Sequence, residues 1–147
     1  MLKGIPQILS PELLKILMEM GHGDEIVIAD GNFPSVTCAQ RLVRADGHNA
    51  PELLKAILQL LPLDIYATPV FIMDKVVGDT VETPIWDEYK AIVSSFDKNA
   101  KIEGMERMAF YERAKSAFAI VATGEKALYA NIILKKGVVT VDNFLVR

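Results

Sequence analysis

Residues for metal binding and disulfide chemistry are scarce in this sequence. The 147 residues include one cysteine, Cys38, and two histidines, His22 and His48. A single cysteine excludes an internal disulfide, which fits a reducing compartment. The sequence has neither an HExxH nor a CxxC spacing, so we expect no metal ion. Because Cys38 has no histidine pattern nearby and no GxSxG element occurs, nucleophilic catalysis is disfavoured as well.

Concentrated charge and long apolar runs are also missing. The net charge is −3 and the 16 basic residues are scattered, so no surface for nucleic acid or an anionic membrane is expected. No run approaches the roughly 18 apolar residues of a membrane span. The first residues lack the charged and apolar regions of a secretory signal. GHGDEI precedes a strand, whereas a nucleotide-binding glycine loop would open a helix. We expect a soluble, cytoplasmic protein.

The sequence does contain alternating helix and strand signals. Hydrophobic residues make up 51% of the chain, enough for one well-packed domain. Ser10 and Pro11 open a helix as N-cap and N1 residues, and Gly21 ends it. Such alternation predicts an α/β fold, here a single-domain three-layer α/β/α sandwich with a mixed sheet. Helices are expected near residues 11–20, 51–61, 84–96 and 109–116, and strands near 25–29, 69–73 and 118–122 with a pair at 131–134 and 138–141.

The stretch MGHGDEIVIADGNFP carries the first polar candidates. His22 lies between two glycines, which leave its ring uncovered, and an imidazole exchanges a proton near neutral pH. Asp30 follows a buried apolar strand, at the edge where open α/β sheets bind ligands. The plainer alternatives are that His22 only caps the preceding helix and that Asp30 only satisfies its own turn.

A second polar cluster lies in the C-terminal third. Arg107 precedes the MAFYER segment, whose plainer interpretation is a solvated helix face. Tyr129, Ala130 and Asn131 stand between a glycine turn and an apolar strand, so a phenol and an amide are presented where that strand starts. The alternatives are a half-buried aromatic for Tyr129 and turn chemistry for Asn131. None of these residues would be chosen as a site residue on its own.

Taken together, three segments resemble the family of sugar mutarotases and D-ribose pyranases. The resemblance runs essentially without gaps from residue 1 to about 138, so residues 1–147 form one mutarotase-like domain, with 140–147 as a tail extension past the usual family end. Arg107 followed by FYER resembles the L-fucose mutarotases, whereas ribose pyranases tend to carry a histidine near that arginine. The segments are ILSPELLKILMEMGHGDEIVIADGNFP, VRADG and MAFYERAKSAFAIVATGEKALYANIILKKGV.

The resemblance implies an isomerase that interconverts the α and β anomers of L-fucose, or of a related monosaccharide, without cofactor or metal. One acid and one base suffice to open and reclose the hemiacetal ring. His22 and Asp30 are expected to face the sugar across the rim of the sheet. The family also implies a homodecameric ring with active sites at subunit contacts. His22 corresponds to the proton donor, and the sugar-binding residues correspond to Asp30, Arg107, Tyr129, Ala130 and Asn131.

Three alternatives remain open at this point. A D-ribose pyranase would need the same ring opening to interconvert pyranose and furanose forms. A non-catalytic sugar-binding module would keep the hydroxyl contacts without proton transfer. A metal-assisted lyase or hydrolase is the third choice, and elemental analysis would test it.

Overall fold

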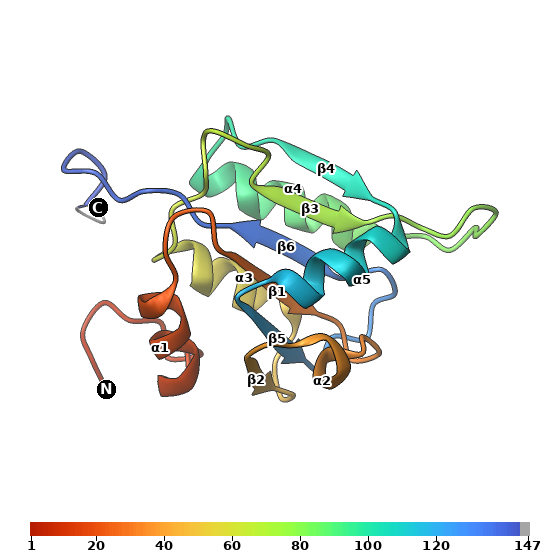
Figure 1. The fold of residues 1–147 in the computed structure, drawn as a ribbon, viewed down its shortest axis with the longest axis horizontal. Coiled ribbons are helices and arrows are strands. Elements are labelled where there is room, and N and C mark those ends of the chain that lie inside the picture. The colour runs from red at the N-terminus through yellow and green to blue at the C-terminus, as the bar shows by residue number, and fades with distance from the viewer. Residues whose placement is uncertain (145–147) are drawn as a thin grey trace.

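The computed structural model describes residues 1–144, and its helices and strands alternate along the chain. Within that range one six-stranded sheet has the strand order β2-β5-β1-β6-β3-β4 and carries helices on both faces (Figure 1). The expected three-layer α/β/α sandwich with a mixed sheet is confirmed. The elements are α1 (Pro11–Glu19), β1 (Glu25–Ala29), α2 (Ser35–Cys38), β2 (Leu42–Ala45), α3 (Ala50–Leu58), β3 (Val70–Met73), α4 (Pro84–Phe96), β4 (Ile102–Met105), α5 (Arg107–Ser116), β5 (Ala119–Thr123) and β6 (Ile132–Lys135).

The central strand β1 is buried on both faces. Ile26 and Ile28 join the core that includes side chains of α1, α3 and α4, whereas Val27 and Ala29 join the core under α2 and α5. Burial on both faces explains why this strand is an unbroken apolar run. Strands β1, β2, β3, β4 and β5 all run in one direction, and β6 lies antiparallel between β1 and β3. The five parallel strands therefore end at one edge of the sheet, where β6 begins.

Helix α1 starts as its sequence predicts and ends slightly earlier. The Ser10 hydroxyl accepts a hydrogen bond from the Leu13 N–H at 3.1 Å, and proline occupies the first turn. The helix closes at Glu19, with Met20 as its C-cap. The left-handed backbone conformation falls on Gly23, with φ 85°, rather than on Gly21.

Of the expected strand pair at residues 131–134 and 138–141, the first strand forms and the second does not. Strand β6 pairs with β1 and β3, not with the residues that follow it. Residues 141–143 form a turn, closed by the Asn143 N–H to the Thr140 carbonyl at 3.2 Å. Of the predicted tail 140–147, the last three residues lie outside the described range.

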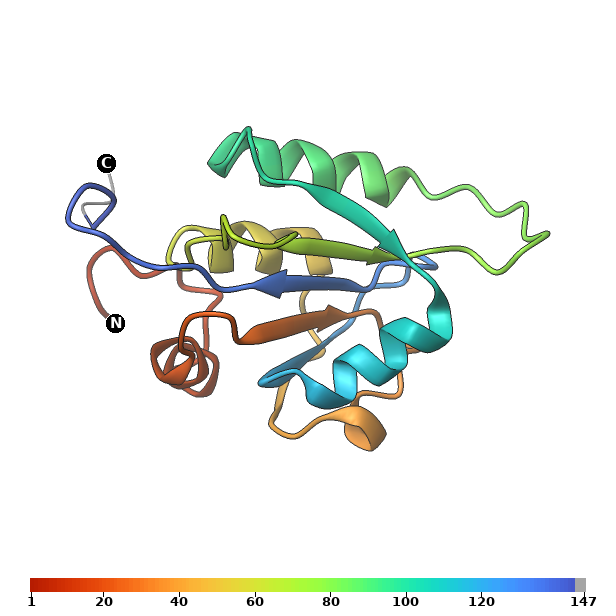
Figure 2. The ribbon, with the colours of Figure 1, turned by 45° about the horizontal axis from the view of Figure 1, so that its top comes forward.

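A long connection between β3 and α4, residues 74–83, extends away from the body of the fold (Figure 1, Figure 2). We call it the projecting loop. It leaves from the edge at which the parallel strands end. Among the described residues, no helix combines the length and apolar composition needed to cross a membrane.

Candidate active site

A hollow of about 210 Å³ lies where β1, β3 and β4 end and β6 begins. Four of the five sequence-predicted sugar-binding residues line it: Asp30, Arg107, Tyr129 and Asn131. They come from segments far apart in the sequence, and the mixed sheet brings those segments to one edge. The hollow therefore presents a carboxylate, a guanidinium, a phenol and an amide to the same small volume.

Asp30 and Asn131 form a buried, reciprocal pair. The Asp30 N–H donates to Asn131 Oδ1 at 2.8 Å, and Asn131 Nδ2 donates to Asp30 Oδ2 at 3.1 Å. The Asn32 N–H donates to the other carboxylate oxygen at 2.9 Å. Burial raises the pKa of Asp30, although these hydrogen bonds oppose the shift. The fixed carboxylate lines the hollow, so it can accept a ligand hydroxyl there.

The backbone of Tyr129 is held in a strained conformation. Its φ is 55°, in the left-handed region that non-glycine residues seldom adopt. Trp86 Nε1 of α4 donates to the Tyr129 carbonyl at 2.8 Å. The phenol donates to Asp79 Oδ2 on the projecting loop and accepts from the Val76 N–H at 3.3 Å. The hydrogen bond to Asp79 raises the pKa of Tyr129. The phenol is thus fixed at both its backbone and its hydroxyl.

Arg107 and Ala130 have different settings. Arg107 is the first residue of α5, is exposed, and forms no ion pair with any residue of the described range. Its guanidinium is available to a ligand oxygen. Ala130 is fully buried, does not line the hollow, and accepts the Tyr89 hydroxyl at its carbonyl at 2.7 Å. Ala130 therefore fixes the strand start from behind the hollow, and its predicted contact with the sugar stays a prediction.

His22 lies at the opposite end of β1 from Asp30, so the two side chains of one chain are not close together. The residues next to it pair with the far end of β6: the Gly23 N–H donates to the Lys136 carbonyl at 2.9 Å. Asp30 instead lies beside Asn131, where β6 begins. The six residues 24–29 between Gly23 and Asp30 span about 20 Å at roughly 3.3 Å per residue. Within one chain the two residues flank opposite ends of β1, so the expectation that both face one sugar stays a prediction that requires a second copy of the chain.

A buried carboxylate holds His22 at that second edge. His22 Nε2 lies 3.1 Å from Asp64 Oδ1, and 47% of the histidine side chain is exposed. Burial acts to raise the pKa of Asp64, but the hydrogen bonds from His22 and from the Tyr66 N–H outweigh it and keep the pKa below its ordinary value. A carboxylate on one ring nitrogen fixes the ring and leaves Nδ1 free. The His22 ring is therefore held by Asp64 on one side and remains half exposed.

Several residues that line the hollow are not among those predicted from the sequence. Asn32 and Phe33 lie two and three residues after Asp30, and Tyr111 stands one helical turn after Arg107, so spacing alone could have indicated these three. Nothing in the local sequence indicates Asp79 or Val76, because they reach the hollow only through the path of the projecting loop. The remaining unpredicted lining residues are Met73 and Leu128.

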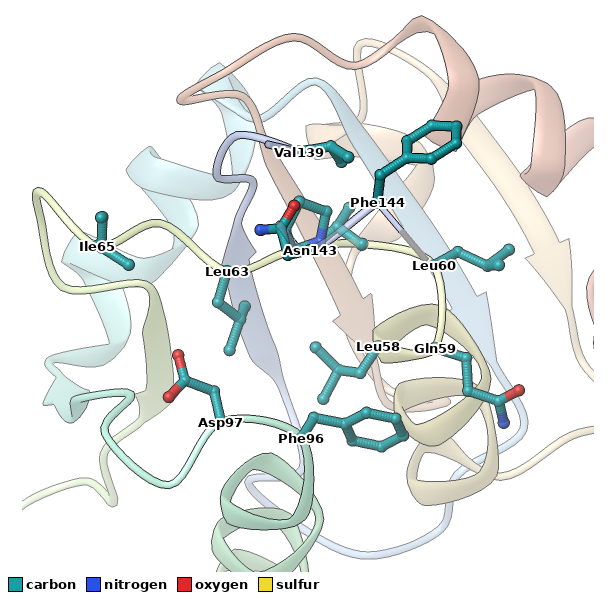
Figure 3. A pocket seen from close by; sticks show the side chains of 12 residues that line it. Leu58, Gln59, Leu60, Leu63, Ile65, Phe96, Asp97, Val139, Asn143 and Phe144 are labelled. Carbon is teal, nitrogen blue, oxygen red and sulfur yellow. The ribbon is translucent and has the colours of Figure 1, made fainter. Parts of the chain in front are cut away.

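A second, larger hollow of about 450 Å³ has a different character. Figure 3 shows the side chains that line it, which come from the end of α3 (Leu58), the end of α4 (Phe96) and the C-terminal segment (Val139, Phe144). Most of its lining is aliphatic or aromatic, and it lacks a convergent set of polar groups. Within residues 1–144, no group of three or more histidine, cysteine, aspartate and glutamate side chains is placed to hold a metal ion.

Comparison with known proteins agrees with this geometry. The chain is 53% identical to the fucose mutarotase of Danio rerio over 144 residues, which are 94% of each chain. A crystal structure of a fucose mutarotase from Streptococcus pneumoniae in complex with L-fucose is 54% identical, covers 95% of this chain and 100% of its own, and superposes with a TM-score of 0.89. Bacillus subtilis RbsD complexed with D-ribose shares the fold, at 24% identity and a TM-score of 0.68, over 90% of this chain and 95% of its own. Residues 3–139 match the family model described as the RbsD / FucU transport protein family, and the chain belongs to that family.

Proposed function

We propose that this chain is a mutarotase that interconverts the α and β anomers of L-fucose by opening and reclosing the sugar ring, without a cofactor. The observation that carries the proposal is the convergence of Asp30, Asn131, Tyr129 and Arg107 on one small hollow. The relatives named as fucose mutarotases, at more than half identity over most of the chain, support the same substrate class.

The chemistry assigns each group a role. Asp30 and Asn131 hold sugar hydroxyls, because their mutual hydrogen bonds fix both side chains and leave acceptor capacity free. Tyr129 and Arg107 orient or stabilise the oxygen of the opened sugar. His22 supplies the proton to the ring oxygen as the bond from that oxygen to the anomeric carbon breaks. Positioned proton transfer of this kind accelerates reactions by about 10² to 10⁴-fold.

The proton donor comes from a second copy of the chain in this proposal. His22 and the hollow lie about 20 Å apart on one chain, too far for both to touch one monosaccharide. Exposed apolar side chains flank both places: Ile65 and Tyr66 follow Asp64 beside His22, and Val77 and Leu128 lie beside the hollow. Exposed apolar residues near two incomplete half-sites are typical of surfaces that meet in an oligomer. We propose that the chain assembles as a homodecamer, as its resemblance to the family implies.

Proton NMR saturation exchange between the anomers of L-fucose tests the activity, with D-ribose as the second sugar. We expect the wild type to accelerate fucose exchange and His22→Ala to reduce the rate by about 10² to 10⁴-fold. His48→Ala is the matched control, since this partly exposed histidine, two residues before α3, lies outside the proposed site. A wild-type rate in folded His22→Ala would overturn the assignment of the donor. Acceleration of ribose exchange alone would favour a pyranase, and bound sugar without acceleration would favour a binding module.

A further inference from the structure

The projecting loop makes two hydrogen bonds with the Tyr129 hydroxyl of the hollow, one through Asp79 and one through the Val76 N–H. Asp79, near its tip, accepts the hydroxyl proton of Tyr129 at Oδ2, while its other oxygen, Oδ1, accepts the Val81 N–H at 2.9 Å. Lys75 Nζ ties the same loop back on itself through the Val81 carbonyl at 3.0 Å. The carboxylate is therefore fixed by the turn of the loop as well as by the phenol.

The hydrogen bonds of the Tyr129 hydroxyl determine what it can offer a ligand. A phenol has one proton to donate and two lone pairs to accept with. The proton is committed to Asp79, and one lone pair is taken by the Val76 N–H. One lone pair remains, so Tyr129 meets a sugar hydroxyl as a hydrogen-bond acceptor. An acceptor placed on the anomeric hydroxyl is what the base side of ring opening requires.

We propose that Asp79 is the positioning residue for this base: it holds the Tyr129 hydroxyl as an acceptor and takes up the phenol proton when the sugar ring opens. This rests on the mutarotase function proposed above. As the bond between the anomeric carbon and the ring oxygen breaks, its electron pair goes to the ring oxygen, which takes a proton from His22. The anomeric hydroxyl becomes a carbonyl and passes its proton to the Tyr129 oxygen, and the phenol proton passes to Asp79 Oδ2. Reclosure on the other carbonyl face returns both protons.

The charges around the phenol set the resting state from which that transfer starts, with Tyr129 protonated and Asp79 ionised. Asp79 lies on one side, and its hydrogen bond from Tyr129 keeps its own pKa low, so it is an ionised acceptor in the resting protein. Lys75 on the same loop also favours the ionised carboxylate. The positive charge of Arg107, at the start of α5, favours the phenolate of Tyr129. Asp30 is the second carboxylate of the hollow, but it is engaged with Asn131 and Asn32.

Titration of Tyr129 in the sugar-free protein tests the pairing. The chain has four tyrosines, so the tyrosinate absorbance of Tyr129 is isolated by subtracting the curve of Tyr129→Phe. Because Asp79 raises the pKa of Tyr129, Asp79→Asn should let Tyr129 ionise at lower pH. Glu82→Gln removes a carboxylate from the same loop and should leave the Tyr129 curve unchanged. An unshifted curve in Asp79→Asn would overturn the pairing.

A double-mutant cycle tests the role in catalysis. Asp79→Asn keeps the size of the side chain and an oxygen for the Val81 N–H, but it cannot take up a proton. We expect kcat for fucose exchange to fall by about 10 to 100-fold with KM changed less than about three-fold, and the remaining rate to rise with pH as Tyr129 ionises. In the Tyr129→Phe background the same substitution should change kcat less than about two-fold, because the two residues act as one unit.

The outcomes distinguish a failure of the Asp79 proposal from a failure of the proposed mutarotase function. Equal losses on adding Asp79→Asn to the wild type and to Tyr129→Phe would show that Asp79 acts without Tyr129, and a wild-type kcat in Asp79→Asn would remove its role altogether. If the wild type accelerates exchange of neither sugar, the mutarotase function fails and the relay with it, while the titration still decides whether Asp79 and Tyr129 are paired.

Discussion

We expect the buried carboxylate of Asp30 to make the folded protein less stable. Only 6% of this residue is exposed, and its burial raises its pKa above 3.8. A buried acid with a raised pKa makes the folded state less stable wherever it is ionised. We predict that Asp30→Asn lowers the fucose exchange rate at least about ten-fold but leaves the thermal midpoint unchanged or raises it by a few degrees. Calorimetry at neutral pH alongside the exchange assay measures both.

The pH dependence of that effect has a definite sign. The penalty from Asp30 is fully present above its folded-state pKa and disappears as pH falls toward 3.8, so the midpoints of the variant and the wild type should converge in acid. Asn131→Ala provides the contrast, because it strips the buried Asp30 N–H of its partner and should cost about 1 to 3 kcal/mol. Equal destabilisation by the two substitutions would contradict this account of Asp30.

At the same scale, short motifs predicted some of the residues that line the hollow and not others. Asp30 and Asn131 could be recognised because each adjoins a buried strand at a turn, and turns at strand ends meet at one edge. Asp79 could not, because nothing in its local sequence shows that the loop after β3 returns to Tyr129. His22 was correctly singled out as an uncovered histidine, but its distance from Asp30 follows from the strand length between them.

At the scale of elements, helix α5 is fixed to the sheet by an ion pair that also sets its direction. Arg113 donates to both oxygens of Glu25 at 2.7 and 2.9 Å, and its guanidinium lies 4.9 Å from the centre of the Phe71 ring. Arg107 begins the same helix at the hollow. We predict that Arg113→Met lowers the free energy of unfolding by about 1 to 2 kcal/mol, a value reduced for the partial exposure of the pair. Urea unfolding followed by circular dichroism measures it.

Lys115→Met is the control within the same helix. Its partner Glu112 is exposed and one turn away, so no measurable change in stability is expected from its loss. The position of Arg107 depends on how α5 lies on the sheet, so Arg113→Met should also raise KM for fucose, whereas Lys115→Met should not. If both substitutions gave the same urea curve, the anchoring role of Arg113 would be excluded.

Long apolar or well-capped elements were predictable, and short edge elements were not. Strand β1 and helix α4 have the expected bounds, since one is an unbroken apolar run and the other begins at a proline and keeps its helical spacing. Strands β2 and β4 were missed because they are short and mostly exposed, and β4 contains a glycine. The hairpin expected after β6 failed because β6 is held by long-range pairing with β1 and β3.

At the scale of the whole molecule, the fold separates His22 from the residues that line the hollow. His22 and Asp64 lie where β1 begins, and the hollow lies where it ends. If each working site takes the hollow from one copy and His22 from a neighbour, neither edge is active alone. A dilution series with light scattering should then show activity falling together with the mass of the assembly. Full activity at the mass of one chain would contradict the shared site.

Mixing two inactive variants gives the sharpest test of this arrangement. His22→Ala keeps an intact hollow and Asp30→Asn keeps an intact His22, so copies of the two can complete each other. With random assembly of equal amounts, about a quarter of the shared sites should combine both intact halves, and the exchange rate should recover to about a quarter of the wild type. Mixing Asp30→Asn with Asn131→Ala is the control, because both changes damage the hollow and every site stays defective. If the first mixture stayed as inactive as the second, both halves would have to come from one chain, which would require His22 to leave Asp64 and cross the length of β1.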